Sequence, residues 1–314
     1  MSFSSEVKEE LSKHTGSSRH CQLAELASII TSIGYVSEDG EGGRALYLLT
    51  DNELALRKFF TLIKKAFNIG TSILEEMPDV RAKGRLYRPV LADDEKVMNI
   101  LKATRLMEAD GTVRDFEMGA SPLITRNSCC KRAFLRDAFL CLGSISDPNK
   151  GYHLEFVCTS REQALYLQSL IESFDIEARI VVRKKYHVLY IKEGSQIVDL
   201  LNIMEAPVSL MNLENLRILK EMRNSINRSV NCEVANMAKT ISAATKQIED
   251  IAYIRDNGGL ERLPDNLREM AEVRLEHPDA TLSELGSFLD PPVGKSGVNH
   301  RLRKLSEFAD RMRF

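Results

Sequence analysis

Apolar residues recur at helical spacing in two segments of the chain, and each of these segments stops at a glycine. The first segment, Cys21 to Ile33, predicts a helix that ends at Gly34. The second segment, Cys129 to Leu142, predicts a helix that ends at Gly143, which follows Gly34 by 109 residues. We expect each glycine to end its helix in the left-handed conformation, which glycine adopts freely.

The same separation occurs at a second pair of landmarks. Thr159 also follows Thr50 by 109 residues, and a strand-like run of apolar residues precedes each threonine. An identical offset at two separated points indicates an internal repeat. We expect the two glycine-ended helices to pack against each other, because the small residues Ala27, Ser28 and Ala138 allow a close approach.

Both repeats predict the same order of elements, α-β-β-α-β-β-α. After its first helix, the first repeat predicts two strands within residues 35–50 around a Gly-rich turn, a helix over 51–68, strands over 71–76 and 86–91 joined by the basic connection 81–85, and a helix from 93 or 94 to 106. The second repeat predicts a turn-rich stretch over 144–151 between strands, a strand ending at 158, a helix capped by Ser160, strands over 177–183 and 187–191, and a helix over 195–204. The fold class is therefore α+β.

Pro207 marks a change, because the pattern after it is helical to the end of the chain. Two long amphipathic helices are predicted over 211–225 and 233–255. Asn227 and Asn231 lie between them, and we favour helix capping for these two over contact with DNA or a partner. Three shorter helices follow, over 265–277, 281–289 and from Gly294 or Lys295 to Phe308, and they predict a helix-turn-helix unit.

Composition narrows the class of protein. The 314 residues are 43% hydrophobic and 28% charged, with a net charge of −2, so any argument for nucleic-acid binding has to be local.

Six cysteines without a Cys-x-x-Cys pair indicate neither a disulfide framework nor a zinc site, and we interpret Cys129-Cys130 as helix packing. We expect no cofactor and no metal. Without a signal peptide or a membrane-length apolar run, we predict a cytoplasmic, nucleoid-associated protein.

The last predicted helix carries the clearest functional signal. Val298, Leu302 and Leu305 define its buried face. Between Val293 and Leu305 there are four basic residues and no acid, which favours a recognition helix in the major groove of double-stranded DNA over a merely solvated face. Asn and Arg side chains suit adenine and guanine edges, whereas Lys and Ser suit phosphates. The predicted DNA-binding residues are Thr281, Ser283, Lys295, Ser296, Asn299, His300, Arg301, Arg303 and Lys304.

A second set of basic residues lies on corresponding hairpins of the two repeats. They are either solvent-facing strand residues or a basic saddle over DNA or a partner. This possible secondary surface comprises Arg81, Lys83, Arg85, Arg88, Arg183, Lys184 and Lys185.

A duplicated αββαββα unit with glycine-ended helices resembles the LAGLIDADG homing endonuclease fold. In that family, the penultimate motif positions are acids that hold divalent metal for phosphodiester cleavage. Here Ile33 and Leu142 stand at those positions and offer no oxygen ligand. Asp137 cannot replace the pair, because its counterpart in the first repeat is Ser28. We therefore predict no catalytic residues and no enzyme activity.

Three motifs extend the resemblance to nearly the whole chain. The start Ser2–Leu11, the linker signature Asn227–Thr240 and the terminal motif Pro291–Leu305 resemble the WhiA family of bacterial DNA-binding regulators. The resemblance implies a transcription regulator of sporulation, or of cell division and chromosome segregation. The alternatives are a residual nuclease or maturase, and a protein-docking module for a co-regulator or sigma factor that binds DNA only through its C-terminal domain.

The predicted domains follow from these patterns. They are an N-terminal helix (1–20), two LAGLIDADG-like repeats (21–126 and 127–206), a helical linker (207–260) and an all-α helix-turn-helix domain (261–314).

Overall fold

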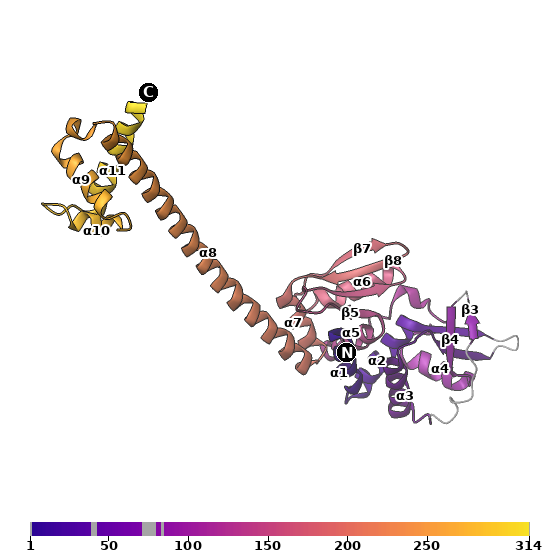
Figure 1. Ribbon diagram of the computed structural model, residues 1–314. Helices are drawn as coiled ribbons and strands as arrows, with labels where there is room; N and C mark the ends of the chain where they lie inside the picture. Colours follow the sequence, from indigo (N-terminus) through magenta and orange to yellow (C-terminus); the bar gives the residue numbers. More distant parts are fainter. Residues whose placement is uncertain (1, 39–42, 71–79, 83–84, 314) are drawn as a thin grey trace. The chain divides into compact units, whose positions relative to one another are not determined.

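The computed structural model describes residues 2–38, 43–70, 80–82 and 85–313. The chain divides into two compact units, Met1–Lys220 and Glu221–Phe314, which we describe separately. Figure 1 traces the elements of both units along the chain. The predicted strand over 71–76 lies outside the described residues.

The first unit contains the two predicted repeats in the predicted order. The first repeat, with the helix that precedes it, comprises α1 (Phe3–Lys13), α2 (Arg19–Ile33), β1 (Gly34–Glu38), β2 (Arg44–Leu48), α3 (Glu53–Phe67), β3 (Val80–Ala82), β4 (Arg85–Leu91) and α4 (Asp94–Ala103). The second repeat, with the short 3-10 helix before it, comprises η2 (Phe116–Met118), α5 (Ser128–Leu142), β5 (Gly143–Ile145), β6 (Leu154–Cys158), α6 (Arg161–Glu172), β7 (Arg179–Arg183), β8 (Tyr186–Ile191) and α7 (Gly194–Ile203). The predicted connection 81–85 is shorter than expected, since Arg81 and Ala82 belong to strand β3 and Arg85 belongs to β4.

The two sheets have the same topology, which confirms the internal repeat. The first sheet has the antiparallel order β1-β2-β4-β3, and the second has the order β5-β6-β8-β7. In the first unit, side-chain caps mark the starts of α1, α3, α4 and α6. For example, Asn52 accepts a hydrogen bond from the Leu54 amide at the start of α3, and Ser160 accepts one from the Gln163 amide at the start of α6.

Helices α2 and α5 pack closely against each other, as the small residues predict. The Ser28 hydroxyl donates to the Phe134 carbonyl across the contact at 2.7 Å. Each repeat also reaches into the other with an amide side chain. Asn52 donates to the Leu140 carbonyl, and Gln163 donates to the Thr31 carbonyl, both at 2.9 Å. The two accepting carbonyls occupy equivalent positions of the repeat, so the pseudo-twofold relationship includes these contacts.

The two glycines end their helices for a different reason from the predicted one. Gly34 and Gly143 have φ of −82° and −80°, so neither is left-handed. Instead, a Cβ atom on Gly34 would lie 2.3 Å from the Ile30 carbonyl oxygen. One on Gly143 would lie 2.2 Å from a ring carbon of Phe139. Glycine is required because the chain turns directly from helix into strand and leaves no room for a side chain.

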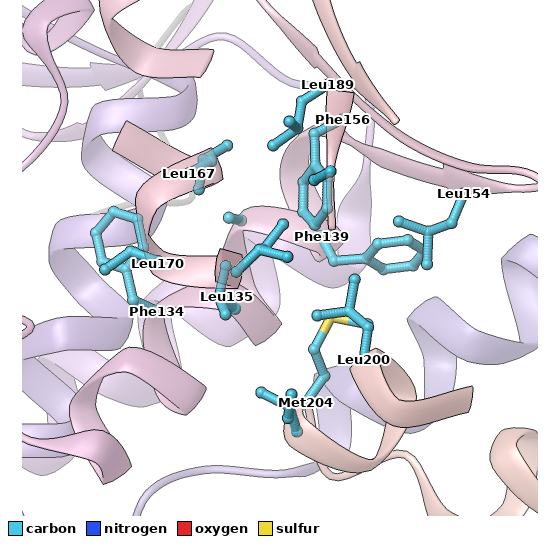
Figure 2. Packing of buried hydrophobic residues seen from close by; sticks show 14 of the residues in the cluster. Phe134, Leu135, Phe139, Leu154, Phe156, Leu167, Leu170, Leu189, Leu200 and Met204 are labelled. Carbon is cyan, nitrogen blue, oxygen red and sulfur yellow. The ribbon is translucent and has the colours of Figure 1, made fainter. Parts of the chain in front are cut away.

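Each repeat has its own hydrophobic core, and the α2–α5 contact joins them. Leu26, Ile29 and Ile30 of α2 pack into the core of the first repeat, whereas Ala24 and Ala27 belong to the core of the second. Figure 2 shows the second core around two aromatic rings, those of Phe139 on α5 and Phe156 on β6. Their centroids lie 5.8 Å apart in an edge-to-face arrangement.

The two long helices predicted after Pro207 are one helix, α8 (Pro207–Asp256). Asn227 and Asn231 lie in its interior, so the prediction that they cap separate helices is wrong. An interior asparagine costs well under about 1 kcal/mol in helix propensity, and no proline or glycine occurs between Val208 and Asp256. Ten large apolar side chains of this helix are exposed: Val208, Met211, Ile218, Leu219, Met222, Ile226, Val230, Val234, Met237 and Ile241.

The second unit is helical, as predicted. After α8 it comprises η3 (Leu260–Arg262), α9 (Asp265–Glu276), α10 (Leu282–Ser287) and α11 (Lys295–Arg313). Its core joins the last turns of α8 to the three following helices through Ile251, Met270, Leu285 and Leu302. Helix α11 extends five residues beyond the predicted end at Phe308. In the part of the chain that the structure describes, no helix is long and apolar enough to cross a membrane.

Candidate nucleic-acid interface

Helix α11 has one buried face, as its sequence pattern predicts. Val298, Leu302 and Leu305 are at most 1% exposed and belong to the core of the second unit. The buried positions recur at intervals of four and three residues, so most of the side chains between them face solvent. The apolar residues therefore fix which side of α11 can meet a ligand.

The opposite side of α11 is polar and basic. Ser296, His300 and Arg303 lie nearly opposite the buried face, and Asn299 and Lys304 lie on its flanks. Six of the predicted DNA-binding residues are exposed on α11: Lys295, Ser296, Asn299, His300, Arg303 and Lys304. Arg303 lies 3.4 Å from Glu307 one turn further along, an exposed pair that contributes little energy and can open when a phosphate or base competes. The structure thus places most of the predicted contact residues on one accessible surface, and we call these six residues the α11 face.

Three predicted residues lie outside the α11 face. Arg301 is largely covered by α9, where its guanidinium lies 3.8 Å from the Glu269 carboxylate and donates to the Asn266 carbonyl. Thr281 caps α10, since its hydroxyl accepts from the Glu284 amide while the Glu284 carboxylate accepts from the Thr281 amide. The latter bond lowers the pKa of Glu284. Ser283 is exposed on α10.

The connection between α10 and α11 depends on a glycine that the sequence analysis did not select. The Val293 amide donates to the Gly286 carbonyl at 2.9 Å, which holds the residues before α11 against α10. A Cβ atom on Gly286 would lie 2.0 Å from the Val293 carbonyl oxygen. A glycine inside a short helix is the signal that could have revealed this close approach.

In the first unit, Ile33 and Leu142 both line a cleft of about 1390 Å³ at the C-terminal ends of α2 and α5. The LAGLIDADG-like fold implies a divalent metal between these two positions. Aliphatic side chains supply none of the oxygen ligands that Mg²⁺ requires, so these residues do not fit that metal. Lys185 also lines this cleft.

Asp137 lies away from this cleft, inside a cluster of buried charges. Its carboxylate is 3.3 Å from the ammonium group of Lys58, and both side chains are fully buried. Glu25 and Arg136 extend the cluster, with 3.6 Å between their charged groups. Burial raises the pKa of Asp137, and the charge of Lys58 opposes the rise. Asp137 is therefore held as part of the packing between the repeats.

The structure describes the positions of all but one of the basic residues predicted on the two hairpins. Arg81 lies on β3, Arg85 and Arg88 lie on β4, and Lys83 is outside the described residues. Arg183 at the end of β7 pairs with Glu155 at 3.0 Å. Lys184 follows it with a positive φ of 56°. The secondary surface stays a prediction.

Three family models match successive parts of the chain. They are the WhiA N-terminal LAGLIDADG-like domain over residues 19–107, the WhiA LAGLIDADG-like domain over 131–223 and the WhiA C-terminal HTH domain over 226–309. A curated relative from Lachnoclostridium phytofermentans is 52% identical over the full length of both chains. The chain belongs to the WhiA family.

Other members agree with this assignment. The relative from Lachnoclostridium phytofermentans and one from Alkaliphilus metalliredigens, which is 46% identical, are both named probable cell division protein WhiA. The second covers 100% of this chain and 99% of its own. The crystal structure of full-length DUF199/WhiA from Thermatoga maritima is 25% identical, covers 99% of each chain and has a TM-score of 0.57. The WhiA arrangement of two LAGLIDADG-like domains before an HTH domain is thus the one found here.

Proposed function

We propose that this WhiA-family chain is a sequence-specific DNA-binding transcription regulator of cell division or sporulation, without nuclease activity. The observation that carries the proposal is the α11 face, where six polar and basic side chains are exposed on a helix that has one buried apolar face. A helix that is third in a compact helical unit, and whose exposed side is polar and basic, has the form of a recognition helix.

The residues of the α11 face divide into two kinds of contact. Asn299 and Arg303 are four residues apart and so lie on one side of the helix, where their side chains can pair with adenine and guanine edges. Lys295 and Ser296 lie in the first turn, where free backbone amides also favour phosphate. Such phosphate contacts position the helix, and the base contacts provide specificity.

The absence of nuclease activity is supported by the chemistry of the cleft. Ile33 and Leu142 provide no metal ligand where the related fold places two acids. Asp137, the nearest acid in the sequence of α5, is fully buried beside Lys58. It therefore cannot reach a phosphodiester bound at the protein surface.

DNA binding by the full-length protein tests the recognition helix. Sites selected from random duplexes, and a scrambled duplex, would be titrated by fluorescence anisotropy at several salt concentrations. Arg303→Ala should reduce the ratio of specific to non-specific affinity by about 5–150-fold, since a base contact is worth about 1–3 kcal/mol. Lys304→Ala should weaken binding to both duplexes alike and lower the salt slope by about 1.

The matched control is Arg262→Ala, which removes an exposed positive charge of the second unit outside α11. It should leave the specificity ratio unchanged. Equal and non-specific losses in the Arg303, Lys304 and Arg262 variants would overturn the assignment of α11.

A cleavage assay tests the non-catalytic proposal separately. We expect supercoiled plasmid to stay intact with the full-length protein and Mg²⁺ or Mn²⁺. Metal-dependent nicking that disappears in Asp137→Asn would overturn this part of the proposal and leave the assignment of α11 untouched.

A further inference from the structure

The first unit brings together four potential metal ligands from two pairs of residues that lie more than a hundred positions apart in the sequence. His20 and Cys21 lie in the first turn of α2, and Cys129 and Cys130 lie in the first turn of α5. The sulfur atoms and the ring nitrogen all lie within 4.8 Å of one another, and this is the one such group found among the described residues. We call these four residues the Cys₃His cluster.

The three distances from the imidazole to the sulfur atoms of the Cys₃His cluster are close to the edges of a metal-centred tetrahedron. The Nδ1 atom of His20 lies 3.2 Å from the Sγ atom of Cys130, 3.4 Å from that of Cys21 and 4.0 Å from that of Cys129. A tetrahedral zinc with ordinary Zn–S and Zn–N bond lengths separates sulfur from nitrogen by about 3.6 Å. The three distances bracket this value, so a metal needs only small side-chain adjustments to bind.

We propose that the Cys₃His cluster binds one structural Zn²⁺ ion. Three thiolates and one imidazole are a common tetrahedral ligand set for zinc, whereas hard cations such as Mg²⁺ and Ca²⁺ require oxygen ligands. Four protein ligands close the coordination shell and leave no position for substrate, so the ion stabilises the fold and does not activate water. The site goes beyond the proposed DNA-binding function and does not depend on it.

The surroundings of the cluster suit a cation bound by thiolates. The positive ends of the α2 and α5 dipoles meet there, which favours negative charge on the sulfur atoms. Zinc binding would displace the thiol protons of the three cysteines, as it does in thiolate sites generally. His20 and Cys129 are exposed, so an ion can enter from solvent.

The position of the site indicates what the zinc does. It joins the start of α2 in the first repeat to the start of α5 in the second, more than a hundred residues later in the chain. The cleft lined by Ile33 and Leu142 lies at the other end of the same two helices. The ion would therefore fasten the two repeats together at one end of their shared helix contact. Free energy of metal binding adds directly to the stability of the folded state.

Metal content and cobalt spectroscopy test the proposal on the full-length protein. We expect one equivalent of zinc per chain after purification without added metal. Protein reconstituted with Co²⁺ should show thiolate-to-cobalt charge transfer and the intense visible bands of a tetrahedral site. Chelation should lower the thermal midpoint of the first unit.

Two variants replace exposed ligands, so they disturb packing little. His20→Ala and Cys129→Ser should each weaken zinc binding by more than about 10–100-fold. Replacing a residue that only hydrogen-bonds to a metal ligand already costs about that much affinity. Their thermal midpoints should no longer respond to chelator. The control Cys232→Ser, which changes an exposed cysteine of α8, should keep full zinc content.

Several results would overturn the proposal. One is folded protein that contains no zinc and does not retain zinc after it is added. Another is equal zinc content in Cys129→Ser and in the wild type. The others are iron in place of zinc, and a disulfide within the cluster that persists in zinc-containing buffer.

Discussion

Lys58 offers the sharpest test of how the two repeats are held together. Its ammonium group lies 3.3 Å from the Asp137 carboxylate and 4.0 Å from that of Glu25, and all three side chains are fully buried. It also donates to the carbonyls of Leu11 and His14, so it ties α1 to the repeats. Lys58→Met keeps most of the side-chain volume and removes only the charge and the donors.

The expected loss can be bounded from these distances. At 3.3 Å and an effective dielectric of about 20, the attraction between Lys58 and Asp137 is about 5 kcal/mol. Removing one partner of a buried pair usually costs about 3–5 kcal/mol, because the other charge is left uncompensated. We therefore expect Lys58→Met to lower the free energy of unfolding of the first unit by about 3–5 kcal/mol. Adding Asp137→Asn should restore about 1–3 kcal/mol, because the carboxylate nearest to Lys58 is then replaced by a neutral amide.

Urea unfolding of the full-length protein, followed by circular dichroism, measures these energies. The two units provide an internal control, since the transition of the second unit should not move. Lys65→Met removes an exposed charge from the same helix and should change stability by less than about 0.5 kcal/mol. The reasoning is refuted if Lys58→Met costs less than about 1 kcal/mol, or if the double variant loses the full sum of the two single losses.

Three further predictions concern stability. Gly143→Ala should cost about 1–3 kcal/mol in urea unfolding, because its Cβ would overlap the Phe139 ring, while Gly151→Ala, which has open space, should be nearly neutral. Burial and the nearby Asp137 charge raise the pKa of Glu25 from 4.5 to about 8, so the folded state keeps a proton that the unfolded chain releases. The free energy of unfolding should therefore fall as the pH rises from about 4.5 to about 8, and Glu25→Gln, measured over the same pH range, should reduce this fall. Thr281→Ala should cost about 1 kcal/mol of stability in the second unit through loss of the α10 cap, and anisotropy should show an unchanged specificity ratio.

Local sequence signals failed around Asn227 and Asn231 for an identifiable reason. The segment around Asn227 and Asn231 contains residues that favour caps, and it predicts a break between two helices. Capping preferences are worth about 1 kcal/mol, and an uninterrupted run without proline or glycine allows every backbone hydrogen bond of α8 to form. Helix α8 therefore continues through the linker signature Asn227–Thr240.

The sequence by itself determined the duplicated αββαββα order, the three helices after Asp265 and the buried face of α11. These features depend on hydrophobic periods of 3.6 and 2 residues, which are local properties of the chain. Only the tertiary structure decided which distant groups meet. Cys21 reaches Cys130, Lys58 reaches Asp137, and Arg301 turns to α9, because helices pack at angles that depend on the side chains of both partners. No spacing along one segment contains that information.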